Sequence, residues 1–296
     1  MGARKSGFLA SAVALLWLAP GSAFAGGSQP SAWVSGSGVN ATTCGSTSSP
    51  CRTFQYAYNN VVAPGGTIYV RDAADYSPIK ITHAISIIND SGGTATIVAV
   101  SGDAIDVQAA GSTVHLKGLT LDGVGLGANG VNFTSGASLT IENCTIKGFA
   151  GNAFTGDGIL FHPVAGTPLL TVTDSVLSGN ANAGVAVLVP STGVATPHVS
   201  STLTRVDAVN NLFGVEVGGA TNDLVTLNAT EVNVSGNYYG FTVVSGGALY
   251  LSRSTATGNN YGVLIDSAKA YSYGDNAING NIGTDVAGAL TRATSR

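Results

Sequence analysis

Five side chains with oxygen atoms cluster at two nearby positions of the chain's repeated turns and could hold a hard cation such as Ca²⁺. Asp103, Asn129 and Asp157 occupy equivalent turns, and Asp106 and Asn132 follow three residues after the first two. Carboxylate and amide oxygens gathered on one side of a fold are the ligands that Ca²⁺ prefers. These five residues are therefore candidate calcium ligands, but Asp and Asn are also ordinary turn residues, and that simpler interpretation is the stronger of the two.

The same carboxylates could perform acid–base chemistry. If the turns stack, Asp103 and Asp157 lie two layers apart, at about 10 Å, which is near the upper separation for the carboxyl pair of an inverting glycoside hydrolase. These two are therefore the candidate catalytic residues. The four histidines fall at different positions of the repeat, so we expect them to be surface or strand residues rather than ligands.

Equivalent positions on successive repeats form a column, and in the second half of the chain the column that begins with Asp103 holds aromatic residues. Phe213, Tyr239 and Tyr261 follow it, and Tyr250 and Tyr271 align in the strand that comes next. Flat rings can stack on sugar rings, although stacked aromatics also simply stabilise neighbouring layers. These five residues are the predicted binding site for an extracellular polysaccharide or another surface partner.

The elements that position these columns come from an internal repeat. Pairs of a small and an apolar residue recur 22 to 30 residues apart, from Ala104-Ile105 to Gly262-Val263, and each opens a period with two or three short strands. The chain has 41 Gly and 21 Asn, which favour frequent turns. Several periods end in an asparagine that can hydrogen-bond to the next layer: Asn180, Asn211, Asn237, Asn259 and Asn281. This pattern predicts an all-β solenoid, a single-stranded parallel β-helix.

Aligning two neighbouring repeats predicts specific contacts between them. An offset of 25 residues places Lys117 over Glu142 and Asp122 over Lys147, as two stacked ion pairs. It also places Cys144 in a slot that a leucine occupies on the previous repeat. Since its neighbours at every second position are apolar, we expect Cys144 to be a buried thiol rather than a nucleophile.

The first 25 residues have the pattern of a secretory leader. Arg4 and Lys5 precede an apolar stretch from Phe8 to Leu18, and Ala23-Phe24-Ala25 fits a cleavage site. No second apolar run reaches the roughly 20 residues of a membrane span. The net charge of −4 disfavours nucleic acid as a partner. We expect a secreted, periplasmic or cell-surface protein with no membrane span.

The segment before the repeats is expected to close the solenoid. Apolar residues at i, i+3, i+4 and i+7 from Phe54 to Val61 predict one face of a short helix. Cys44 and Cys51 bracket a loop of Gly, Ser, Thr and Pro in a chain with a secretory leader, so we expect them to form a disulfide.

Residues 65–285 resemble the right-handed parallel β-helix family, the pectin-lyase-like superfamily. The stretches Trp33–Gly38, Pro50–Phe54 and Gly65–Val70, with Tyr76, look like the opening of many exported β-helix proteins of unassigned activity. The resemblance implies a right-handed coil with an N-terminal capping helix, and in pectate lyases it implies Ca²⁺. Polygalacturonase-like members carry paired aspartates, a Gly-His-Gly turn and an Arg-x-Lys string, and none of these strings occurs here.

The expected organisation is a leader over residues 1–25, a cap segment over 26–64, the β-helix over 65–285 and a tail over 286–296. The expected function is engagement of an extracellular polysaccharide or another surface partner, without a catalytic motif and without a required cofactor. The alternatives are a polysaccharide lyase or glycoside hydrolase, and a structural or adhesive protein.

Overall fold

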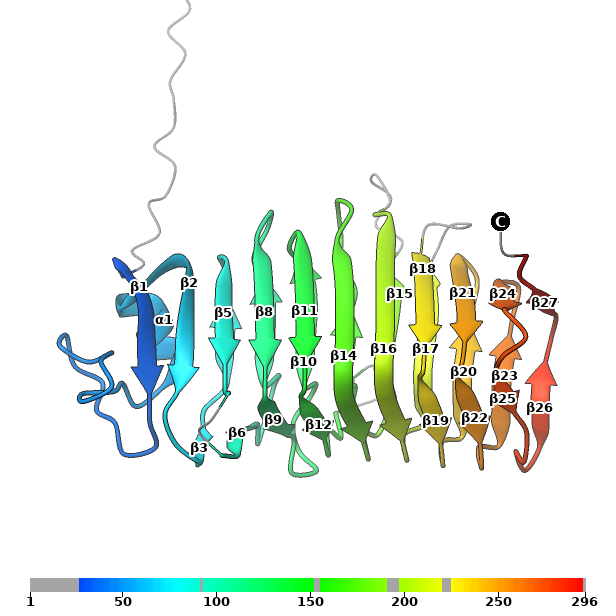
Figure 1. The fold of residues 1–296 in the computed structure, drawn as a ribbon, viewed down its shortest axis with the longest axis horizontal. Coiled ribbons are helices and arrows are strands. Elements are labelled where there is room, and N and C mark those ends of the chain that lie inside the picture. Colours follow the sequence, from blue (N-terminus) through cyan, green and yellow to red (C-terminus); the bar gives the residue numbers. More distant parts are fainter. Residues whose placement is uncertain (1–26, 91–92, 152–154, 191–196, 220–224, 295–296) are drawn as a thin grey trace, which may run out of the picture.

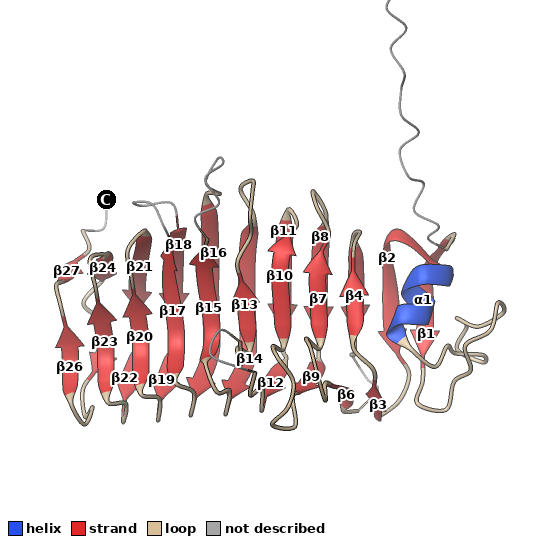
Figure 2. Cartoon of the chain, turned by 180° about the vertical axis from the view of Figure 1, so that it is seen from behind, coloured by secondary structure: helices blue, strands red, loops and turns tan. Residues whose placement is uncertain are grey.

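The chain winds into a long solenoid of stacked coils (Figure 1). The computed structural model describes residues 27–90, 93–151, 155–190, 197–219 and 225–294, so the predicted leader lies outside the described residues. The near strands of Figure 1 run downwards while the coil advances from left to right, and the strands on the far side, in front in Figure 2, run upwards. This winding is right-handed, and the predicted right-handed parallel β-helix is confirmed.

Two sheets form the walls of the solenoid, and all strand pairs in the described part of the chain are parallel. The nine-stranded sheet contains β4 (Ile79–Ile81), β7 (Ile105–Gln108), β10 (Val131–Ser135), β13 (Ile159–Phe161), β15 (Ala183–Val189), β17 (Phe213–Gly219), β20 (Tyr239–Val243), β23 (Tyr261–Ile265) and β26 (Thr284–Ala287).

The second, bent sheet has 18 strands. Its long face contains β1 (Gln29–Val34), β2 (Val62–Val70), β5 (Ile85–Ile88), β8 (Thr113–Lys117), β11 (Ser138–Glu142), β14 (Leu169–Ser178), β16 (Val199–Val209), β18 (Val225–Thr230), β21 (Gly247–Ser252), β24 (Lys269–Ser272) and β27 (Leu290–Arg292). Its short face contains β3 (Ala74–Tyr76), β6 (Ala95–Val98), β9 (Leu119–Asp122), β12 (Thr145–Lys147), β19 (Asn233–Ser235), β22 (Thr255–Thr257) and β25 (Ala277–Ile278), with the ends of β14 and β16.

Side chains alternate along each strand, and Ile, Val and Leu fill the inward positions. Ile105, Val131 and Ile159, for example, are register partners on three successive coils, and all three are fully buried. Burying a side chain of this size stabilises a fold by about 1.5–3 kcal/mol. Phe133 and Phe161 also lie inward and stack on each other at 4.2 Å between ring centroids. Because the inward positions are mostly apolar, most polar side chains lie on the outward positions.

An asparagine ladder runs through the turns inside the solenoid. Each amide oxygen accepts hydrogen bonds from the backbone N–H and the side-chain amide of the preceding member, at 2.9–3.3 Å. The carboxylate of Asp285 ends the ladder by accepting from the last amide at 2.8 Å. The members are the predicted Asn180, Asn211, Asn237, Asn259 and Asn281, so the expected onward hydrogen bonding is confirmed.

Glycines lie directly beside this ladder because the coils approach one another closely there. A Cβ atom on Gly214 would lie 2.7 Å from the carbonyl oxygen of Gly240 and 2.9 Å from the amide nitrogen of Asn237. Contacts this short exclude a side chain. The small residue that opens each repeat is therefore required by coil spacing.

The corner between the two faces of the bent sheet is built from residues with positive φ. Asp174, Arg205, Glu231 and Arg253 all adopt φ between 45° and 56°, a left-handed conformation that non-glycine residues seldom take. Their charges alternate along the solenoid. The Nε and Nη2 atoms of Arg205 donate to the two carboxylate oxygens of Asp174 at 2.6 and 2.8 Å, and Arg253 Nε donates to Glu231 at 3.0 Å. This exposed ladder satisfies the corner's charges on the side opposite the asparagines.

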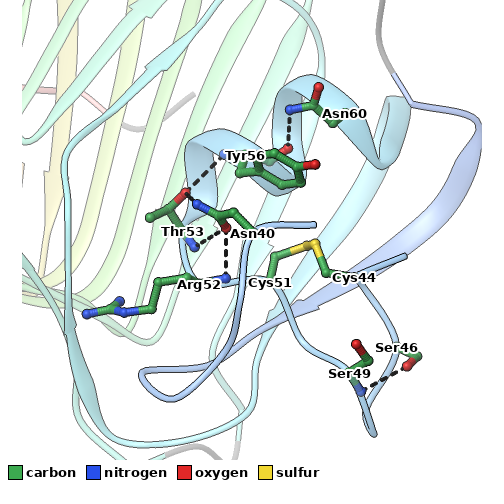
Figure 3. Close-up of a disulfide and its surroundings, with 9 residues drawn as sticks. All are labelled: Asn40, Cys44, Ser46, Ser49, Cys51, Arg52, Thr53, Tyr56 and Asn60. Atoms are coloured by element: carbon green, nitrogen blue, oxygen red, sulfur yellow. Dashed lines mark hydrogen bonds between the residues drawn. A yellow bond between two sulfur atoms is a disulfide. The ribbon is translucent and has the colours of Figure 1, made fainter. Parts of the chain in front are cut away.

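The N-terminal end is closed by helix α1 (Phe54–Asn60) and a disulfide-bonded loop. The Thr53 hydroxyl accepts from the Tyr56 backbone N–H at 3.2 Å and caps the helix, as Figure 3 shows. Phe54, Ala57 and Tyr58 are buried on its inner face. The predicted capping helix and the Cys44–Cys51 disulfide are therefore confirmed.

The remaining contacts predicted from the repeat alignment are also present. Lys117 lies 3.6 Å from Glu142, and Lys147 lies 3.2 Å from Asp122. Cys144 is 3% exposed, and burial raises the pKa of its thiol to about 11, which leaves it protonated and unreactive at neutral pH. The coil continues beyond the boundary expected at residue 285, because β27 pairs with β24.

Replacing Asn237 with Ala tests the ladder. The change removes the acceptor of Asn211 and a donor to the Ala208 carbonyl, so we expect a loss of about 1–3 kcal/mol in the free energy of unfolding, measured by urea denaturation. Asn228→Ala is the control, because this half-buried side chain makes no hydrogen bond within the described residues. Equal losses in the two variants would contradict a special role for the ladder.

Candidate functional site

The outer face of the nine-stranded sheet carries most of the predicted site residues. Asp103, Asn129 and Asp157 occupy the turns before β7, β10 and β13 on successive coils. The column passes through Ala183 and continues at Phe213 on β17, and the pairing of β17 with β20 and β23 adds the two tyrosines beyond. The register therefore joins the predicted oxygen-bearing side chains and the predicted aromatic rings in one line.

Asp103 is the centre of a closed hydrogen-bond network. The side-chain amides of Asn129 and Asn132 each donate to one of its carboxylate oxygens, both at 2.8 Å. The amide oxygen of Asn129 accepts from the backbone N–H groups of Gly156 and Asp157. The structure thus brings these predicted ligands together, but their oxygens face donors within the protein.

Protein donors already occupy the oxygens that a calcium ion would need at Asp103 and Asp106. An ion at Asp103 would have to displace two amide donors, and among the described residues no three His, Cys, Asp or Glu side chains are grouped to hold a metal. Asp106 already contacts the Lys80 ammonium at 3.6 Å and the Gln108 amide at 3.0 Å. Calcium binding at these five residues stays a prediction.

A depression of about 360 Å³ opens at the N-terminal end of this face. It is lined by Lys80, Asp103, Asp106 and, from the capping helix, Gln55. Farther along, the Nε2–H of His162 donates to the amide oxygen of Asn132 over 2.7 Å. Burial lowers the pKa of His162 although the charges of the two nearby aspartates oppose the shift, so this imidazole is neutral at pH 7.

Asp157 is the buried carboxylate of the column, at 1% exposure. Its Oδ1 accepts from the Asn182 amide at 2.8 Å and from the Ala183 N–H at 2.9 Å, while Oδ2 has no partner within the described residues. Burial raises the pKa of Asp157 to about 6, and these two hydrogen bonds limit the rise. An acid with an unsatisfied buried oxygen favours the protonated form.

Glu216 is a second acid with a raised pKa, and the sequence pattern did not predict it as a site residue. It lies at the outward centre of β17, between its register partners Ala186 and Thr242. Burial, and then the negative charge of Asp157, raise its pKa to about 7. Thr242 is 2% exposed, and its hydroxyl has no partner in the described part of the chain. The only sequence signal was a single acid in a column that otherwise holds small or apolar residues on these coils.

The aromatic half of the column is a continuous stack of rings. The ring centroids of Phe213 and Tyr239 are 4.9 Å apart, those of Tyr239 and Tyr261 are 5.3 Å apart, and the planes differ by 12° and 19°. Tyr238, half exposed, meets Tyr239 edge-on at 4.7 Å. Because inner ring faces cover one another, the stack presents mainly ring edges and hydroxyls.

Tyr250 and Tyr271 form a separate stack on the other sheet. They are register partners on β21 and β24, with centroids 4.8 Å apart and planes 14° apart. The five predicted aromatic residues therefore do not form one surface. They form two stacks on different walls of the solenoid, which provides a matched pair for mutagenesis.

Comparison with known proteins found one similar structure and no matching family. No protein-family model matches the sequence, and no curated protein matches it. A similar solved structure is the crystal structure of pectate lyase Pel9A, at 14% identity over 80% of this chain and 76% of that chain, with a TM-score of 0.44. The parallel β-helix itself is established by the strand pairing. Among the described residues, no helix is long and apolar enough to cross a membrane.

The two shifted acids predict a pH dependence of stability. Their folded-state pKa values, about 6 and about 7, exceed the ordinary values of 3.8 and 4.5, so the folded protein binds protons more tightly than the unfolded chain. Their contribution to stability is full below pH 4 and is lost as the pH rises through 6 to 7. Glu216→Gln should flatten this part of the unfolding free energy measured from pH 4 to pH 8. Asp266→Asn, at the exposed end of β23, should not, and identical profiles for both variants would contradict the assignment.

Proposed function

We propose that this protein binds an extracellular polysaccharide along the outer face of the nine-stranded sheet. The observation that supports this most strongly is the single column running from Asp103 through Asp157 to the stacked rings of Phe213, Tyr239 and Tyr261. Its members repeat at about 4.8 Å, the spacing between strands. A straight row of hydrogen-bonding groups followed by rings suits an extended chain of sugars.

Each half of the column would make a different contact. The polar half offers the partly exposed Asp103, Asp106 and Asn132, whose carboxylates and amide can hydrogen-bond sugar hydroxyls. Asn129 and Asp157 are buried and would support this surface from beneath. The aromatic half offers the tyrosine hydroxyls and the ring edges, which supply apolar contact with a polar tip. No metal is needed for either contact, and calcium remains an additional proposal for the Asp103 end.

Tyr239→Ala tests this proposal. Removal of the central ring of the stack should weaken polysaccharide binding about three- to tenfold, because one aromatic contact contributes about 0.5–1.5 kcal/mol. The measurement is affinity electrophoresis through gels containing xyloglucan, mannan or homogalacturonan, with Ca²⁺ or with EDTA. Tyr250→Ala, in the stack on the other wall, is the matched control and should migrate as the unchanged protein does. Equal retardation of both variants would contradict this location.

A second candidate function, hydrolysis of the bound polysaccharide, is favoured by one observation. Glu216 has a pKa raised to about 7 and is more exposed than Asp157, so it could give a proton to a glycosidic oxygen near neutral pH. Asp157 would act through its charge on Glu216. Asp103, the candidate from the sequence, accepts hydrogen bonds from two amides, which favour its charged form. Glu216 is therefore the better general acid.

Hydrolysis predicts a specific pH profile. Release of reducing ends should fall as the pH rises above about 7, because the acid must be protonated to act, and Glu216→Gln should abolish it. Asp75→Asn, an exposed acid on β3 of the other sheet, is the control and should retain activity. Activity that survives in Glu216→Gln, or an unsaturated product that disappears with EDTA, would contradict this assignment and direct attention to a lyase at the Asp103 end.

Export is part of the proposal. The Cys44–Cys51 disulfide suits an oxidising compartment outside the cytoplasm, in agreement with the predicted leader. If neither binding nor hydrolysis is found, an adhesive role remains, in which the exposed tyrosines contact a protein partner.

A further inference from the structure

A second depression, of about 600 Å³, lies at the N-terminal end of the solenoid, away from the proposed polysaccharide face. One of its walls is the outer edge of β1, and the other is the segment Thr42–Thr47 of the disulfide-bonded loop. Asn60, at the end of the capping helix, completes it. The depression contains none of the side chains assigned above to the calcium, catalytic or aromatic sites.

The lining is rich in hydroxyl groups and carries no charge. Neither an acid nor a base is among the lining residues, whereas the nine-stranded sheet presents several carboxylates. Such a lining can donate and accept hydrogen bonds without selecting an ion. The hydroxyl groups belong to Ser28, Ser31, Thr42, Thr43, Ser46 and Thr47.

Trp33 provides the apolar part of the same site. Its indole stacks on the Tyr69 ring with centroids 5.2 Å apart and planes 29° apart, because the two residues are register partners on β1 and β2. Among the described residues, no further strand lies beyond β1 at this edge, where only an isolated bridge joins Val34 to Cys51. One indole face is thus covered by Tyr69, and the opposite side of the residue borders the depression.

Several bonds hold the two walls in place. The Trp33 backbone N–H donates to the Gly45 carbonyl at 2.8 Å, and the Cys51 N–H donates back to the Trp33 carbonyl at 2.9 Å. The Ser46 hydroxyl accepts from the Ser49 N–H at 3.0 Å, close to the disulfide that bridges Cys44 and Cys51 (Figure 3). A ligand that enters therefore meets a preorganised surface and orders little of the chain.

We propose that this depression binds a neutral saccharide, with one sugar ring stacked on the free face of Trp33 and its hydroxyl groups bonded to the Ser and Thr side chains of the Thr42–Thr47 segment. An aromatic platform surrounded by uncharged donors and acceptors suits a ligand that has one apolar face and many hydroxyls. The site is independent of the column on the nine-stranded sheet, so either can fail alone.

The protein contains a direct reporter for this proposal. Its two tryptophans are Trp17, in the predicted leader, and Trp33. In the full chain carrying Trp17→Phe, all tryptophan fluorescence comes from Trp33. We expect a saturable change in its emission on titration with at least one of cellohexaose, maltohexaose, mannohexaose and xylohexaose.

Variants separate a binding site from a merely structural tryptophan. Thr43→Val should weaken the fluorescence titration, whereas Tyr239→Ala should leave it unchanged. In calorimetry, Trp33→Leu should lower the affinity about tenfold, the upper effect of one aromatic contact, while Trp33→Phe should retain part of it. Unfolding midpoints by urea establish that each variant is folded.

The contrary results are equally specific. No change in emission and no heat with any of the four oligosaccharides overturns the proposal, as does binding that Trp33→Leu and Thr43→Val leave intact. Binding lost in Tyr239→Ala but kept in Trp33→Leu would overturn this site while supporting the polysaccharide face. The reverse pattern would support this site and overturn that face.

Discussion

Hydrogen bonding between equivalent residues of successive coils is the interaction on which the rest of this molecule depends. Parallel strands bond to the same position on the next coil, and inside the turns the asparagine ladder repeats the arrangement with side chains. Both require the coils to keep one register. A shift by one residue would move every core side chain outward, would break the amide ladder and would push a side chain into the space that Gly214 leaves open.

Because the register is fixed, residues one repeat apart lie side by side in columns, and the residue types in each column determine which groups a wall of the solenoid exposes. On the nine-stranded sheet, the same position is acidic or amide-bearing on the early coils and aromatic on the later ones. The polar part is satisfied internally around Asp103. Asp157 is the last acid before this column becomes aromatic, and Glu216 lies in a neighbouring column of the same sheet, three residues after Phe213. Burial of these two acids makes them the most chemically distinctive groups on this wall.

The N-terminal end differs from the walls because it must stop the sheet. An open strand edge invites pairing with other chains, and here α1 and the disulfide-bonded loop cover the edge of β1. Covering the edge with a loop rather than another strand leaves a concave surface between the two. Trp33 borders that surface because it is the last ring of its stack. The proposed saccharide site is thus a consequence of how the solenoid is capped.

The sequence by itself determined the features that follow from periodicity. The β-helix, the asparagine ladder, the ion pair of Lys117 with Glu142, the buried Cys144 and the short capping helix were all predictable, because each depends on residues one repeat apart or on a local pattern. The disulfide was predictable from two cysteines that bracket a short loop.

Only the tertiary structure decided which groups are chemically unusual. Asp157 was nominated, but its shifted pKa arises from burial, and Glu216 was missed because one acid in a strand carries no signal until its neighbours are placed. The division of the tyrosines between two walls and the depression beside Trp33 likewise depend on how distant segments pack. Spacing along the chain fixes columns, whereas desolvation and concavity are properties of the three-dimensional surroundings.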